Sequence, residues 1–208
     1  MTIVTVDAVP AERVRGRDGG GPASTRTVVA YGFWIFILSD FTMFSALFAA
    51  YAVLSGRTAG GPTGPQVINL YHVFIETVFL LVSSYTCGLG ALSAERRQRG
   101  RYLVFAALTF LLGAAFLFVE ISDFVGMVRL GAWPSRSAFL SAFFTLVGMH
   151  GAHVTIGLLW LVYMVAQVVA KGLRPHVLRR LLCFSLFWHA LDLIWVGVVT
   201  LVYLMGAR

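Results

Sequence analysis

The sequence predicts an all-α integral membrane protein, a bundle of five transmembrane helices. Of its 208 residues, 59% are hydrophobic and only 12% are charged, and the mean hydropathy is +0.84. A soluble domain of this length could not hide so much apolar side chain from water. Five apolar stretches each supply the roughly 20 residues that cross a bilayer. The segments between them are too short to form a soluble domain.

The expected spans form one membrane domain, 28–206, in which short loops join neighbouring helices. Their approximate limits are 28–54, 68–94, 102–128, 138–170 and 177–205. The last two are longer than a minimal span, so we expect them to tilt or to protrude from the bilayer. Residues 1–27 are rich in Gly and Arg and are expected to form a flexible cytoplasmic tail. The tail lacks the long apolar core of a signal peptide.

The positive residues behind the formal net charge of +7 are concentrated on one side of the spans, so the charge gives no reason to expect a nucleic-acid partner. Twelve Lys and Arg residues lie on the side of the N-terminus, in the tail and in the second and fourth loops. Only Arg57, Arg129, Arg136 and Arg208 lie on the other side. This positive-inside pattern predicts a cytoplasmic N-terminus and a periplasmic C-terminus. The basic loops would then meet anionic lipid head groups.

Acidic residues interrupt the first three spans. Asp40 lies near the middle of the first span, where a bare carboxylate costs about 2.5–3.5 kcal/mol. It is either a buried, protonated or hydrogen-bonded packing residue or a proton-handling carboxylate. Glu76 lies about two turns into the second span. Glu120 and Asp123 share one face of the third, where an interhelical hydrogen-bonding role is favoured over catalysis.

Histidines mark the last two spans. His150 and His153 are three apart and therefore share a helical face. Gly148, Gly151 and Gly157 thin the surface of the same helix and are expected to let a neighbouring backbone approach. In the fifth span His189 and Asp192 are also three apart, so the carboxylate is placed to orient the imidazole. Cys87 and Cys183 are expected to be free thiols that pack as small hydrophobes.

Four of these polar residues fall at a similar depth: Glu76, Glu120, His150 and Asp192. Each lies roughly 8–13 residues from the same end of its own span, which is one layer of the bilayer at about 1.5 Å per residue. We therefore expect a shared polar layer that holds the helices together.

Several motifs occur in one order along the chain. Residues 148–157 read GMHGAHVTIG and fit the pattern G-x-H-G-x-H-V-x-x-G. Residues 188–195 read WHALDLIW and fit W-H-x-x-D-x-x-W. Residues 32–36, 58–64 and 74–77 add GFWIF, TAGGPTG and FIET. Together with five spans, they make the membrane domain resemble subunit III of the heme–copper terminal oxidases, most closely that of the cytochrome bo-type quinol oxidases.

The resemblance implies a non-catalytic subunit of a proton-pumping respiratory oxidase in the bacterial inner membrane. It implies no redox centre on this chain, with the hemes and copper on a partner subunit I that it contacts directly. Subunits II and IV would complete the complex, and phospholipid would bind between the helices. The five spans match the bo-type subunit, because the cytochrome c oxidase subunit commonly has seven. Asp40 stands where the latter usually has a buried Glu.

Two other classes remain open from the residues alone. Histidines on two helices could make the chain a heme-carrying membrane anchor, with His150 or His153 paired with His189. His150 and His153 cannot ligate both faces of one heme, because they share a helix. A proton-coupled transporter could use Asp40, Glu76 and Glu120 as a relay. The chain lacks the broken-helix pairs and repeated halves that are typical of such transporters.

Overall fold

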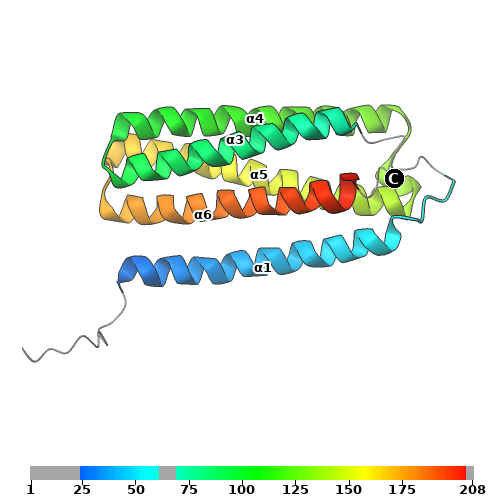
Figure 1. Ribbon diagram of the computed structural model, residues 1–208, viewed down its shortest axis with the longest axis horizontal. Coiled ribbons are helices and arrows are strands. Elements are labelled where there is room, and N and C mark those ends of the chain that lie inside the picture. Colours follow the sequence, from blue (N-terminus) through cyan, green and yellow to red (C-terminus); the bar gives the residue numbers. More distant parts are fainter. Residues whose placement is uncertain (1–23, 61–68, 205–208) are drawn as a thin grey trace, which may run out of the picture.

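The computed structural model describes residues 24–60 and 69–204. In these ranges five helices are long and apolar enough to cross a membrane, and Figure 1 shows them running along one common axis. They are α1 (Thr25–Leu54), α3 (Leu70–Glu95), α4 (Arg99–Arg129), α5 (Ala138–Lys171) and α6 (Pro175–Val198). A 3-10 turn, η2 (Pro134–Arg136), precedes α5, and α6 continues as a π-helix, η3 (Val199–Leu204).

When η3 is counted with α6, the observed helices differ from the expected spans by at most three residues at any end. The 34 residues of α5 make it about 51 Å long at 1.5 Å per residue, well over a hydrocarbon core of about 30 Å. Residues 1–23 lie outside the described residues, so the flexible tail stays a prediction. Residues 61–65 of the first loop also lie outside the described residues.

Polar side chains mark where the helices start. Ser24, Asn69 and Ser137 precede α1, α3 and α5, and the side-chain oxygen of each accepts a hydrogen bond from a backbone N–H of the first turn. Pro175 opens α6, where its missing N–H costs nothing. Gly172 ends α5 with a φ of +70°, a value that favours glycine.

Four helices form a tight core, and α1 lies along one side of it. The helices α3 and α4 pair as an antiparallel hairpin, α6 packs against both α3 and α5, and α1 contacts α5 and α6. Phe116, Phe143 and Trp195 are fully buried between the helices. Only Ile37, Phe44 and Tyr51 of α1 are buried, so most of that helix faces outward.

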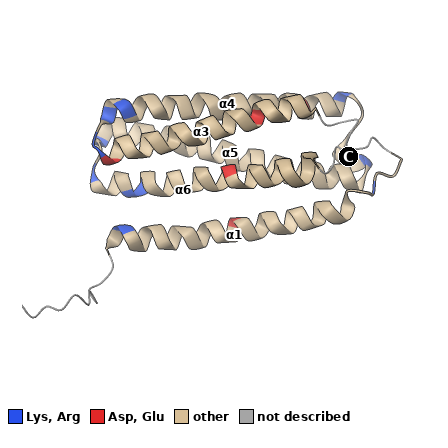
Figure 2. Cartoon of the chain, in the orientation of Figure 1, with Lys and Arg blue, Asp and Glu red and all other residues tan. Residues whose placement is uncertain are grey.

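The two ends of the bundle differ in charge, as Figure 2 shows. The arginine-rich end comprises the start of α1, the α3–α4 turn and the α5–α6 turn; in the described part it carries Arg26, Arg96, Arg97, Arg99, Arg101, Lys171, Arg174, Arg179 and Arg180. The sparsely charged end carries Arg57, Arg129 and Arg136. The alternation read from the sequence is therefore a real separation of charge in space.

Arginines at the arginine-rich end also close helix termini. Arg97 donates to the backbone carbonyl of Leu173, and Arg99 donates to the carbonyl of Val169 at 2.9 Å. These carbonyls lie at the end of α5 and just beyond it, where the helix has unpaired acceptors and its dipole favours positive charge. Arg26 pairs with Glu95 and ties the start of α1 to the end of α3.

Candidate functional site: a polar and aromatic layer inside the bundle

Three of the four polar residues expected in one layer are buried between helices. Glu76 on α3, Glu120 on α4 and His150 on α5 expose 1%, 4% and 0% of their surface. Asp192 on α6 is half-buried. Since ionisable side chains at membrane depth are costly against lipid, their burial within protein is the arrangement that the sequence argument required.

Glu120 fills the space that Gly151 leaves empty. A Cβ atom at position 151 would lie 2.9 Å from both Oε1 and Oε2 of Glu120. The sequence suggested that this glycine admits a neighbouring backbone, but it admits a carboxyl group of α4. Both carboxyl oxygens are buried and have no hydrogen-bond partner within the described ranges. A buried polar group without a partner costs about 1–3 kcal/mol, so this carboxyl is a strained element of the layer.

His150 sits in a cage of aromatic rings. Its imidazole stacks on Trp195, with centroids 5.1 Å apart and planes inclined by 30°. Phe116 meets it edge-on at 5.8 Å, and Phe44 lies 6.4 Å away. Neither ring nitrogen has a hydrogen-bond partner in the described part of the chain. These contacts come from α1, α4 and α6, so His150 joins three helices to α5.

His153 behaves differently although it shares the face of His150. It is half-buried, and its Nδ1 lies 2.8 Å from the carbonyl oxygen of Met149 on its own helix. Its ring also contacts Phe44 at 5.4 Å. The two histidines are therefore not equivalent: one lies in the core, and the other lies beside α1.

Asp123 meets a histidine of the neighbouring helix. His72 Nδ1 on α3 lies 2.7 Å from Asp123 Oδ1 on α4, near the sparsely charged end. The side chains are 42% and 24% exposed, so this pair lies partly at the surface of the bundle. The contact fits the interhelical role expected for Asp123 and gives it a specific partner, His72, on the neighbouring helix.

His189 is oriented by α3. Its Nδ1 lies 2.6 Å from Ser84 Oγ. Asp192, the partner suggested by the spacing of three, has one buried oxygen without a hydrogen-bond partner in the ranges described. Helical spacing placed the two residues on one face of α6, but the imidazole points across to α3.

Trp188 is a wedge that joins all four core helices. Its six-membered ring lies between Gly113 of α4 and Gly157 of α5: added Cβ atoms there would come within 3.1 Å and 2.8 Å of ring carbons. Its Nε1 donates to Ser83 Oγ of α3 at 3.1 Å. Two turns further along α6, Trp195 repeats the pattern by donating to Thr77 Oγ1 at 3.1 Å. Each indole thus has a hydrogen-bond partner despite its burial.

The glycines of α5 divide into two kinds. Gly151 and Gly157 are sites of close contact, whereas a Cβ at Gly148 would meet Phe124 at 3.7 Å, an ordinary van der Waals distance. The close-packing role expected for Gly148 is therefore wrong: its neighbour leaves room for a methyl group. Gly113 is the close-contact glycine that sequence reasoning missed, because its importance arises from Leu158 and Trp188 of two other helices.

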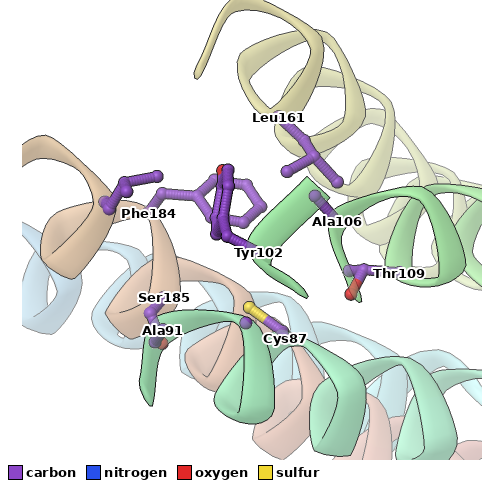
Figure 3. Close-up of a pocket in the computed structure, with 10 residues that line it drawn as sticks. Cys87, Ala91, Tyr102, Ala106, Thr109, Leu161, Phe184 and Ser185 are labelled. Carbon is purple, nitrogen blue, oxygen red and sulfur yellow. The ribbon is translucent and has the colours of Figure 1, made fainter. Parts of the chain in front are cut away.

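A small internal cavity lies nearer the arginine-rich end (Figure 3). It measures about 20 Å³, room for about one water molecule, and α3, α4, α5 and α6 all line it. Tyr102 and Phe184 extend into it from different helices, and Cys87 lies on the α3 side. The Tyr102 hydroxyl is buried without a partner in the described residues, so this cavity offers it space for a hydrogen-bonded water. Cys87 and Cys183 are free thiols, as the sequence predicted.

The geometry does not suit a heme between His150 and His189. Aromatic rings surround His150 at centroid distances of 5.1–6.4 Å, which leaves no space for a macrocycle beside it. His189 is engaged with Ser84. Within the described ranges, no three or more His, Cys, Asp or Glu side chains are grouped so that they could hold a metal ion.

These features define a multi-pass membrane protein in which polar and aromatic side chains serve contacts between helices. Comparison with known proteins assigns the family: the profile of cytochrome c oxidase subunit III matches residues 17–207, and the chain belongs to this family.

Subunit 3 proteins of quinol oxidases are among the relatives of this chain. Cytochrome bo(3) ubiquinol oxidase subunit 3 of Pseudomonas aeruginosa is 51% identical over 177 residues, 85% of each chain. The Pseudomonas putida protein of that name is 47% identical over 84% of each chain. Quinol oxidase subunit 3 of Bacillus subtilis is 43% identical over 84% of this chain and 86% of its own. The chain is therefore a non-catalytic, membrane-spanning subunit of a quinol oxidase complex.

Proposed function

We propose that this chain supports the assembly and sustained turnover of the catalytic subunit I of a bo-type oxidase. Subunit I would be its direct partner and would hold the hemes and copper, with subunits II and IV in the same complex. This role is supported by the observation that the motif side chains contact other helices of the bundle. Trp188, Trp195 and His150 hold helices together across the membrane and are buried at 2%, 0% and 0% exposure.

The charge separation supports a defined orientation. Positive residues are retained on the cytoplasmic side, so the arginine-rich end would face the cytoplasm. With five spans, the C-terminus would then be periplasmic. The bacterial inner membrane is the setting that fits this orientation and the bacterial relatives.

Phospholipid binding is supported by a hollow at the arginine-rich end. A space of about 460 Å³ is lined by Arg26, Glu95, Arg97, Pro175, Leu178 and Arg179. Three guanidinium groups against one carboxylate give it a positive balance, and Leu178 and Pro175 give it apolar walls. This combination suits an anionic head group whose acyl chains continue along the helices.

An accessory role makes a clear prediction for Asp40. This residue is half-buried on α1, a helix of which only Ile37, Phe44 and Tyr51 are buried. Asp40→Asn should leave the visible heme spectrum of the assembled oxidase unchanged, because the substitution keeps size and removes only the charge. The measurement is the absorption spectrum and quinol oxidation rate of purified complex, with wild-type complex as the reference. Complete loss of oxidase chemistry in a fully assembled Asp40→Asn complex would contradict a non-catalytic role.

A further inference from the structure

Four ionisable side chains form a column that leads inward from the sparsely charged end. We call them the acid–histidine column: His72 and Glu76 of α3, with Glu120 and Asp123 of α4. His72 and Asp123 touch at 2.7 Å and are partly exposed, at 42% and 24% of their side chains. Glu76 and Glu120 expose only 1% and 4%. Surface exposure therefore falls from one end of the column to the other.

The residues of this column are spaced at single helical turns. Glu76 follows His72 by four residues, and Glu120 precedes Asp123 by three, so each step is one helical turn with Cβ atoms about 5–6 Å apart. Because α3 and α4 are antiparallel neighbours, both steps lead in the same direction. A single hydrogen-bonded water can bridge such a gap. Glu76 is close enough to Glu120 and Asp123 for their negative charges to interact.

The inner end of the column is buried, and its polar atoms lack hydrogen-bond partners in the described residues. Both oxygens of Glu120 press against Gly151 without a hydrogen-bond partner in the described residues. The next residue, His150, also has two unpartnered nitrogens, and Trp195 and Phe116 pack on its ring. Tyr203 of η3 is buried nearby against Trp195, and the Tyr51 hydroxyl of α1 is engaged with the Val202 carbonyl. No Lys or Arg side chain forms an ion pair with these acids in the described part of the chain.

We propose that Glu76 and Glu120 form an internal proton-binding site that exchanges protons only with the aqueous phase at the sparsely charged end, through Asp123 and His72. One proton from that phase binds to one carboxylate of the pair and converts it to a carboxylic acid. The net charge of the pair rises by one unit, and no bond other than the O–H bond forms. The bound proton relieves like-charge repulsion and turns one acid into a hydrogen-bond donor. Trp195 and Phe116 close the inner side at His150.

The site makes no use of a redox centre and does not depend on the proposed supporting role. Only the naming of the sparsely charged end as periplasmic rests on the proposed orientation. A failure of the proton site would leave the subunit assignment intact. If the subunit assignment were wrong, the titration of these carboxyl groups would still test the proton-binding site.

The test is pH-dependent infrared difference spectroscopy of the complete oxidase in oriented proteoliposomes. The signal is the C=O stretching band of a protonated carboxyl group. A titrating band should vanish in Glu120→Gln or Glu76→Gln complex and remain in Asp40→Asn complex, the matched control for a carboxyl within a span. A wild-type complex without a titrating band, or a band that persists in both glutamine variants, would overturn the proposal.

Side-specific pH steps, confined by membrane-impermeant buffers, test the direction of access. In wild-type complex the band should respond to a step at the sparsely charged end and not to a step at the arginine-rich end. Asp123→Asn should slow the response about tenfold, a rise of about 1.4 kcal/mol in the barrier, because asparagine can still accept a hydrogen bond from His72 but cannot take up and release a proton. A response from the arginine-rich end would refute the inferred direction, and this wild-type experiment needs no variant that might fail to assemble.

Discussion

Trp188→Ala is expected to lower the free energy of unfolding of the chain by about 3 kcal/mol, the lower end of the range for tryptophan truncation in a core. The lower end applies because lipid is as apolar as the lost side chain, so little transfer energy is involved. The substitution removes packing contacts of the indole. Its ring lies within 3.1 Å and 2.8 Å of the points that added Cβ atoms at Gly113 and Gly157 would occupy. The hydrogen bond to Ser83 Oγ at 3.1 Å is lost as well. A cavity would open where α3, α4, α5 and α6 meet.

The measurement is unfolding of the full-length chain in mixed micelles titrated with denaturing detergent. Trp34→Ala is the matched control, because Trp34 lies within span α1 but exposes 44% of its surface. Its truncation should cost well under the Trp188 value. Equal, small effects of the two substitutions would show that Trp188 does not join the helices as the structure indicates.

Gly157→Ala should destabilise the bundle by about 1–3 kcal/mol, although alanine is the better helix former by about 1 kcal/mol. The new methyl group would lie 2.8 Å from Cζ3 of Trp188. The indole cannot retreat, because Gly113 of α4 is in contact with its other edge. The same change at Gly148 meets Phe124 at 3.7 Å and should be neutral or stabilising. Both substitutions lie on α5, so the difference between them measures the space available.

A double substitution separates overpacking from any other cause. Phenylalanine at position 188 shortens the wedge, so Gly157→Ala combined with Trp188→Phe should cost less than the sum of the single changes. Coupling energies between contacting residues are about 0.5–3 kcal/mol. Additive costs, or equal effects of Gly157→Ala and Gly148→Ala, would argue against close packing of Trp188 on Gly157.

The five helices and their approximate limits could be predicted, because an apolar run must be long enough to cross the bilayer. Helix starts are also marked by the local chemistry of Ser24, Asn69, Ser137 and Pro175, a signal that would have placed them more closely. The common depth of Glu76, Glu120 and His150 could also be predicted, because depth follows from counting residues along a helix.

What could not be predicted depends on the faces that the helices present to one another. Spacing paired His189 with Asp192, yet Ser84 of α3 is the actual partner. Gly148 and Gly157 look alike in the sequence, and only the position of Trp188 makes one of them tight. His72 and Asp123 are 51 residues apart, and nothing local joins them. The seven-residue spacing of Trp188 and Trp195 places both indoles on one face of α6. This spacing was a possible sequence signal for the face that packs against other helices.

The central claim is that this chain supports an oxidase without holding its redox centres. The most direct measurement is to purify the tagged chain in mild detergent and to record visible absorption and co-purifying chains together. The account predicts heme absorption only when a larger hydrophobic partner accompanies the chain, and none from the isolated chain. Heme retained by the chain alone would contradict the account and would make His150, His153 and His189 candidate ligands.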